Sequence, residues 1–249
     1  MRRALAFLTP FGPAATPSAA TLGWFPVVGA AIGLAVGGIW WGAAHAWSAP
    51  AAAAIAVAAD VALTGYLHLD GLADAADGLV PPLDRERRLA AMADPAVGAF
   101  GAVTVATVLL LRFGALASAR PAPLVVAALW CGSRTAMAVI ARTLPYARPG
   151  GLATAFAPAV PAGSAITGGR VSRFGAGALV PALVGTTLSV ALAVGGRGLH
   201  GLAALGGEAV GVGAVAALSW RRLGGFTGDV LGAAGVVGET VGLLVLAAR

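Results

Sequence analysis

Charged side chains are scarce in this sequence. Asp, Glu, Lys and Arg make up only 10% of its 249 residues, whereas soluble domains carry about 25%. No polar stretch is long enough for a separate soluble domain, and apolar runs of the length that spans a bilayer, about 17–25 residues, recur throughout. We therefore predict an all-α fold, a polytopic transmembrane helical bundle in which residues 1–249 form a single integral-membrane domain.

Lysine is absent, and cysteine occurs once. The sixteen basic residues are all arginine and do not cluster with aromatic residues into the basic face typical of nucleic-acid binding, so we expect no nucleic-acid partner. The single Cys131 excludes an intrachain disulfide and a cysteine-based metal site. The apolar core of "MRRALAFLTPFGP" is short and meets Pro10, so we expect an amphipathic segment there rather than a cleaved signal peptide.

Seven apolar segments are predicted to cross the membrane, and six or eight crossings also fit the pattern. Their approximate bounds are 24–47, 50–69, 99–119, 122–144, 178–195, 199–220 and 230–248. The four-residue spacing of Gly29, Gly33 and Gly37 lets helix backbones approach closely. We favour packing within the bundle over dimerisation as its role, which leaves a homo-oligomer open.

The arginines are distributed unevenly between the two sides of this layout. With a cytoplasmic N-terminus, eleven arginines fall on the cytoplasmic side and three on the opposite side, as the positive-inside rule requires. We therefore predict a multi-pass protein of the cytoplasmic (inner) membrane, in contact with the lipid bilayer. Its polar segments 70–98, 145–174 and 221–229 would face the cytoplasm, and residues 145–177 would form a loop that could cover a site.

Acidic residues are concentrated rather than scattered, because seven of the ten lie between Asp60 and Asp94. In "GYLHLDGLADAADGL", Asp70, Asp74 and Asp77 share one helical face at about 100° per residue. Ionised carboxylates so close together repel one another. Mg²⁺ or Mn²⁺ would neutralise them, since these ions prefer carboxylate and phosphate oxygens. A solvated helix end paired with nearby arginines, or a proton relay in a transporter, is the alternative.

A second polar motif, "RRLGGFTGDVLGAAGVVGE", covers residues 221–239. Its start combines glycines, which permit close backbone approach, with side-chain oxygens; these residues are Gly224, Gly225, Thr227, Gly228 and Asp229. Glu239 follows about three turns into an apolar helix, where an unpaired carboxylate is costly. A site role for Glu239 and a buried pairing with Arg134 or Arg112 are both open. His68 lies roughly opposite the aspartates, which favours a structural role.

Three stretches, "LHLDGLADAADGL", "RRLAAMADPAVGAFG" and "GGFTGDVLGA", resemble the adenosylcobinamide-GDP ribazoletransferase family, in order and over essentially the full chain. The resemblance implies a Mg²⁺-dependent membrane transferase of late cobalamin biosynthesis. Such an enzyme joins adenosylcobinamide-GDP to α-ribazole or its 5′-phosphate, giving adenosylcobalamin or its 5′-phosphate and GMP. The aspartates resemble CDP-alcohol phosphotransferases more loosely, because that family's Ala-Arg pair and later aspartates are missing. An ion-coupled transporter is disfavoured, since no inverted repeat is visible.

Diphosphate chemistry gives the candidate residues their expected roles. Asp70, Asp74 and Asp77 would hold one or two Mg²⁺ against the diphosphate. One of them, or Asp94, would accept the proton of the attacking ribose hydroxyl. Candidate contacts to phosphate or to corrin side chains are Arg88, Arg134, Arg148 and Arg221. Residues 224–229 would form the opposite wall of the site, and Glu239 is a further candidate for substrate binding.

Overall fold

The structure is a computed structural model that describes residues 1–11, 18–148, 156 and 176–248. Within these residues the secondary structure is helical, apart from an isolated β-bridge between Tyr146 and Phe226. The elements are α1 (Arg2–Leu8), the short 3₁₀ helix η1 (Ala19–Trp24), α2 (Phe25–Ala46), α3 (Ala49–Leu63), α4 (Leu67–Leu79), α5 (Arg85–Ala91), α6 (Ala99–Ser118), α7 (Pro123–Thr143), α8 (Ala176–Leu223) and α9 (Gly228–Ala247). The predicted all-α membrane bundle is confirmed.

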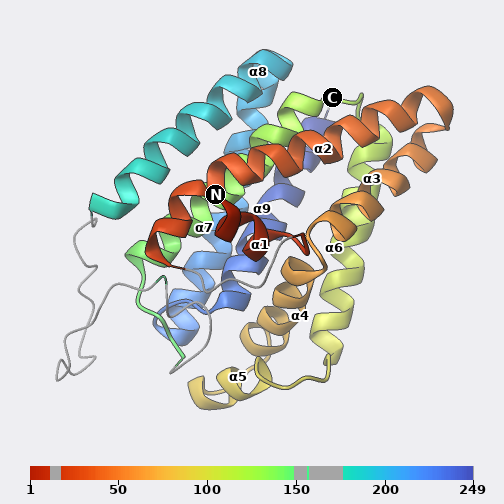
Figure 1. Cartoon of the computed structure of the whole chain (residues 1–249). Helices are drawn as coiled ribbons and strands as arrows, with labels where there is room; N and C mark the ends of the chain where they lie inside the picture. Colours follow the sequence, from red (N-terminus) through yellow and green to blue (C-terminus); the bar gives the residue numbers. More distant parts are fainter. Residues whose placement is uncertain (12–17, 149–155, 157–175, 249) are drawn as a thin grey trace.

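Two helices form the centre of the bundle. In the most apolar stretch of α7, 78% of the residues are buried, and in that of α9, 72% are buried. In the corresponding stretch of α6 only 28% are buried. Helix α8 packs against both helices of this pair, α2 packs against α7, and α4 and α6 pack against α9. Helix α3 packs against α2 and α6 at the edge of the bundle (Figure 1). The core therefore lies along α7 and α9, and the outer helices present apolar side chains to the lipid.

Local sequence explains where the helices begin. Proline occupies the first turn of α2, α3 and α7, where it removes no helical hydrogen bond. Asp84 caps α5 by accepting a hydrogen bond from the backbone N–H of Arg87 at 2.9 Å. Thr227 caps α9, since its hydroxyl accepts from the N–H of Val230 at 3.3 Å. The helix starts are thus encoded by short-range signals.

The number of membrane crossings is close to the prediction. Among the described residues, five helices are long and apolar enough to cross a bilayer, or six if α3 and α4 count as one bent span. The predicted segments 178–195 and 199–220 both belong to α8, which is broken at the non-helical residues Arg197 and Gly198. Figure 1 shows its two arms running in opposite directions. The predicted count of seven is therefore approximate.

The predicted segment 50–69 is not a straight helix. Helix α3 ends at Leu63, and α4 leaves it at an angle of 88°. Gly65 and Tyr66 have φ values of 59° and 61°, a left-handed backbone that α-helices do not contain. The bend separates the apolar α3 from the acidic α4, so the aspartates do not continue the α3 span.

The glycine stripe of α2 packs against α7 of the same chain. A Cβ atom at Gly33 would lie 2.7 Å from the carbonyl oxygen of Val126, and Gly29 and Gly37 approach the α7 backbone similarly. Such contacts leave no room for a side chain. The preference for packing within the bundle over dimerisation is confirmed.

Four charged side chains are buried together between α3, α6, α7 and α9. Arg112 donates to Asp60 at 2.5 Å and to Glu239 at 2.6 Å, and Arg134 also pairs with Glu239. Two acids and two arginines balance in charge, which limits the cost of burying them. Glu239 therefore has both of the arginine partners that its sequence position suggested.

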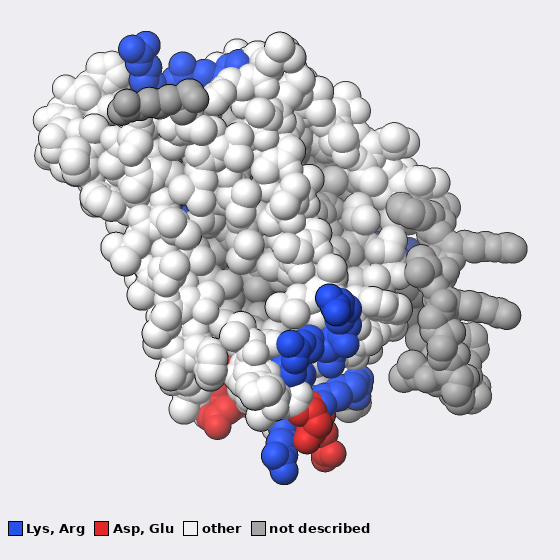
Figure 2. Space-filling model, turned by 180° about the vertical axis from the view of Figure 1, so that it is seen from behind, with Lys and Arg blue, Asp and Glu red and all other residues white. Residues whose placement is uncertain are grey.

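The ends of the bundle carry the charged surface. Figure 2 shows basic side chains at both ends and acidic ones at one end only. At the acidic end, Arg85 donates to the carbonyl oxygens of Leu223, at 2.9 Å, and Ala147, at 2.8 Å. At the other end, Arg197 donates to the Arg120 carbonyl oxygen at 3.0 Å. The described parts of the polar segments assigned to one membrane face thus meet at one end.

Candidate active site

Because of the bend between α3 and α4, the acidic helix α4 lies against the start of α9. Helix α4 packs against α9 at Gly71, where a Cβ atom would lie only 3.0 Å from the Asp229 carbonyl oxygen. Gly232, one turn further along α9, lies against the backbone of His68. The two sequence motifs, more than a hundred residues apart, are thereby in direct backbone contact.

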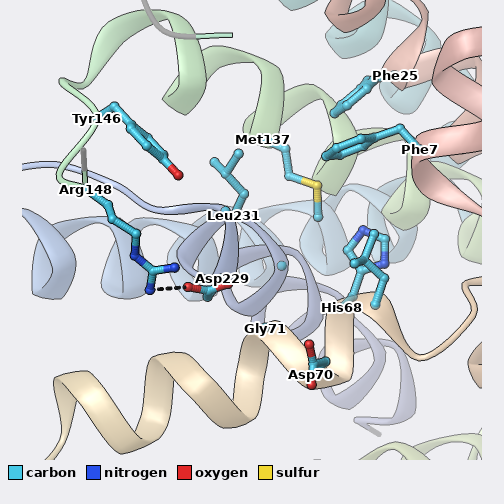
Figure 3. A pocket seen from close by; sticks show the side chains of 13 residues that line it. Phe7, Phe25, His68, Asp70, Gly71, Met137, Tyr146, Arg148, Asp229 and Leu231 are labelled. Carbon is cyan, nitrogen blue, oxygen red and sulfur yellow. Dashed lines mark hydrogen bonds and ion pairs between the residues drawn. The ribbon is translucent and has the colours of Figure 1, made fainter. Parts of the chain in front are cut away.

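A pocket of about 220 Å³ lies where these helices meet the residues that follow α7. Figure 3 shows the guanidinium of Arg148, the phenol of Tyr146 and the carboxylate of Asp229 on one side of it, and aromatic and thioether groups on the other. The lining residues are Phe7, Phe25, Leu67, His68, Asp70, Gly71, Met137, Tyr146, Arg148, Gly228, Asp229, Leu231 and Gly232. Of the predicted site residues, the pocket brings together Asp70, Arg148, Gly228 and Asp229.

The backbone around Tyr146 is fixed to the glycine-rich turn before α9. The N–H of Ala147 donates to the Phe226 carbonyl oxygen at 2.8 Å, and the N–H of Phe226 donates to that of Pro145 at 2.9 Å. Gly225 packs directly against Pro145, and Gly224 adopts a φ of 71° in the turn. These glycines act through the backbone of the turn, which holds Tyr146 beside α9.

Arg148 and Asp229 form an ion pair inside the pocket. Nη2 of Arg148 lies 3.3 Å from Oδ2 of Asp229, and both side chains are about three-quarters buried. Thr227 also donates to Oδ2 of Asp229, at 3.2 Å. Burial raises the pKa of Tyr146, although Arg148 opposes the shift, so its phenol stays protonated near neutral pH. The pocket thus offers a guanidinium and a phenol as donors to an anionic ligand.

The three aspartates of α4 have different surroundings. Asp70 is exposed at the pocket. Asp74, one turn later, is half-buried and interacts electrostatically with Asp229, Asp70 and Arg148. Asp77 instead accepts hydrogen bonds from the N–H groups of Gly98, at 2.8 Å, and Gly101, at 2.9 Å. It therefore binds the N-terminus of α6, where a negative charge is favourable.

Ten of the fourteen predicted site residues do not line the pocket. Five of them are described above: Asp74, Asp77, Gly224, Gly225 and Thr227. Five more lie further away or are buried. Arg88 is buried and donates to the carbonyl oxygens of Gly78 and Leu79, which closes the end of α4. Asp94 is exposed between α5 and α6, and Arg221 is exposed at the end of α8. The remaining two, Arg134 and Glu239, belong to the buried charge network. Most of the predicted loop 145–177 lies outside the described residues.

Comparison with known proteins assigns the chain to a family. A family model described as cobalamin-5-phosphate synthase matches residues 1–247. The chain belongs to this family. Three relatives are each named adenosylcobinamide-GDP ribazoletransferase. The protein from Pseudomonas paraeruginosa is 38% identical over 98% of this chain and 96% of its own length. That from Bradyrhizobium diazoefficiens is 37% identical, covering 100% and 93%, and that from Chlorobium phaeovibrioides is 36% identical, covering 95% and 91%. No solved structure matches the chain.

Membership of the cobalamin-5-phosphate synthase family makes the chain a transferase of cobalamin biosynthesis, and its apolar helices make it a multi-pass membrane protein. The recognised resemblance is thereby confirmed. The pocket of this family member also includes residues that the sequence did not mark as functional, among them His68 and Tyr146. Tyr146 could have been noticed from its place two residues before Arg148. Phe7 and Phe25 gave no signal, because single aromatic residues in apolar segments are common.

Proposed function

We propose that this chain transfers the adenosylcobinamide-phosphate moiety of adenosylcobinamide-GDP to the ribose hydroxyl of α-ribazole or its 5′-phosphate. The hydroxyl oxygen would form a bond to the cobinamide-linked phosphorus, the bond to GMP would break, and GMP would leave. The products would be adenosylcobalamin, or its 5′-phosphate, and GMP, in a late step of cobalamin biosynthesis. The observation that supports this most is that both family-like motifs meet in one pocket, at Asp70 and Asp229.

Arg148 and Tyr146 are suited to bind the diphosphate. The guanidinium can form charge-assisted hydrogen bonds to phosphate oxygens, and the phenol can donate one more. When the diphosphate enters, the Asp229 carboxylate would exchange Arg148 for another partner or share it. Such fixed donors stabilise the charge that develops on the leaving phosphate. The pocket is polar enough on one side to receive this group.

Mg²⁺ is the cofactor that we propose. Within the described parts of the chain, no three His, Cys, Asp or Glu side chains are close enough to form a complete site. Mg²⁺ is usually held by one or two carboxylates together with water and substrate phosphates, and Asp70 and Asp74 fit that donor set. Asp77 keeps free lone pairs besides its two hydrogen bonds. A bound ion would neutralise charge on the diphosphate.

The general base is proposed to be an aspartate of α4. Asp70 lies at the pocket, so it can accept the ribose hydroxyl proton directly, provided that the substrate places this hydroxyl beside it. Asp94 lies outside the pocket lining and would need the α5–α6 connection to move before it could serve. We further propose that the pocket faces the cytoplasm, since the arginine-rich end of the bundle contains it.

The test is release of GMP by purified protein in lipid nanodiscs, with adenosylcobinamide-GDP, α-ribazole and Mg²⁺. We expect turnover that stops with EDTA and returns with added Mg²⁺. Asp74→Asn should lose most of the activity. Asp84→Asn is the matched control, because Asp84 is exposed outside the pocket and Asn caps helices equally well. A folded wild-type protein that releases no GMP with either ribazole or its phosphate would refute the assignment.

A further inference from the structure

The pocket has a second half whose chemistry is unlike that of a phosphate site. Phe7 and Phe25 stack with their ring centroids 5.7 Å apart, and Met137 lies beside them in the lining. Figure 3 shows the imidazole of His68 pointing towards Phe7 and Met137, away from Arg148. Aromatic walls and a thioether favour a flat aromatic ligand over a charged one.

His68 is the polar group of this half. Its side chain is only 5% exposed, and its Nδ1 atom has no hydrogen-bond partner among the residues that the structure describes. A buried polar atom without a partner costs free energy, which a ligand regains by supplying one. An imidazole ring carries at least one N–H group, so His68 can donate a hydrogen bond to a ligand.

The size of the pocket limits what can occupy it. Its volume of about 220 Å³ is below the range of about 300–1,000 Å³ that is usual for drug-sized ligands. An entire corrin ring does not fit, whereas one bicyclic aromatic base does. This inference rests on the proposed function, in which the acceptor nucleoside, α-ribazole, contains a bicyclic aromatic base.

We propose that the apolar half of the pocket binds the aromatic base of the acceptor nucleoside, and that His68 donates a hydrogen bond from Nδ1 to the unsubstituted ring nitrogen of this base. The base packs against Phe7, the partly exposed ring of the pair, which Phe25 supports from behind. Asp70 also lines the pocket, so the attached ribose can reach its carboxylate when the base lies beside His68. His68 thus selects the base, and Asp70 receives the sugar.

The experiment compares two acceptors that differ at one atom. The first is α-ribazole, and the second is its indole isostere, in which a C–H replaces the ring nitrogen. Binding of each free nucleoside to the nanodisc protein is measured by equilibrium dialysis, and KM and kcat are measured from GMP release. We expect wild type to bind α-ribazole about tenfold more tightly, the usual value of one neutral hydrogen bond, with the difference in KM rather than kcat.

Variants at position 68 test the role of the imidazole. His68→Leu should remove the preference, so that both nucleosides bind with similar affinity. His68→Asn should restore part of it, because its amide N–H can occupy the place of Nδ1–H. His45→Leu is the matched control, since His45 is exposed on α2 and outside the pocket lining. It should retain the wild-type preference.

The outcomes separate this inference from the proposed function. Equal binding of both nucleosides by wild type, or an equal loss for both in His68→Leu, would overturn the role of His68. Absence of GMP release from wild type would overturn the proposed reaction, while the binding ratio would still decide whether the pocket recognises the ring nitrogen. A preference that survives in His68→Leu without any loss of affinity would place the base elsewhere.

Discussion

The backbone of Gly71 in α4 lies against the backbone of Asp229 in α9. A Cβ atom at position 71 would be 3.0 Å from the carbonyl oxygen and 3.1 Å from the Cα atom of Asp229. This contact determines how far apart the two polar motifs lie, because neither backbone can yield without moving its helix. The spacing of Asp70 and Asp229 across the pocket therefore depends on a glycine.

Gly71→Val should impair catalysis more than folding. The added side chain would push α4 from α9, and displacements of about 1 Å in an active site can cost about a hundredfold in rate. We expect GMP release to fall about 10- to 100-fold. Gly38→Val is the control, since a Cβ there meets no atom within 4 Å. Equal losses in both variants would mean that the α4–α9 contact has no special role.

Arg148→Gln should weaken binding of adenosylcobinamide-GDP. The variant loses the charge proposed to bind the diphosphate, while its amide can still donate a hydrogen bond to the largely buried Asp229 carboxylate. We therefore expect a KM increase of about tenfold or more and only a small decrease in melting temperature. Arg87→Gln, at an exposed position on α5, should behave as wild type. An unchanged KM in Arg148→Gln would exclude it from the diphosphate site.

Glu239→Leu should destabilise the bundle. The variant leaves the buried guanidinium of Arg134 without its carboxylate partner, and Arg112 keeps only its pair with Asp60. Breaking a buried charge pair in this way costs about 3–5 kcal/mol, to be measured by thermal unfolding in detergent. Glu239→Gln keeps an acceptor oxygen and should lose less. If Glu239→Gln kept full stability but raised the KM for adenosylcobinamide-GDP, the substrate role suggested by the sequence would be supported.

The positions of most helices could be predicted from the sequence because the residues that start and end a helix act locally. Apolar runs, first-turn prolines and caps such as Asp84 each act within a few residues, so most predicted bounds agree closely with the structure. The bend at Gly65 and Tyr66 was missed because a left-handed tyrosine has no reliable sequence signal. It also explains why residues 50–69 looked like one continuous span.

The site could be predicted only in part, because its residues meet through tertiary packing. The periodicity of α4 placed Asp70, Asp74 and Asp77 on one face, but it could not show that Asp77 binds the α6 N-terminus. Likewise, His68 lies off the aspartate stripe, and only the fold of α1 and α2 brings Phe7 and Phe25 beside it. A helical wheel gives directions around one helix and says nothing about its neighbours.

Cysteine labelling should establish the orientation in the membrane. In a Cys131→Ser background, Arg87→Cys and Arg120→Cys each place one thiol at an exposed position, at opposite ends of the bundle. We expect a membrane-impermeant maleimide to label position 120 in intact cells, and position 87 only in inverted vesicles. The reverse pattern would place the pocket on the outer side and contradict the arginine-based prediction.

Asp70 and Asp77 should respond differently to the same substitution. Asp77→Asn keeps one acceptor oxygen for two N–H donors, so we expect a loss of about 1–3 kcal/mol in unfolding free energy. Asp70→Asn removes an exposed carboxylate that holds no structural partner among the described residues, and stability should change by less than about 0.5 kcal/mol. Its GMP release should nevertheless fall about a hundredfold or more, as expected for a general base or metal ligand.

Mg²⁺ dependence then separates the two roles that remain for Asp70. If it holds the ion, higher Mg²⁺ concentrations should recover part of the activity of Asp70→Asn, because the weakened site would fill again by mass action. If it acts only as the base, activity should stay low at every Mg²⁺ concentration. A variant with wild-type turnover at the original concentration would remove Asp70 from both roles and leave Asp74 and Asp77, neither of which lines the pocket, as the candidates on α4.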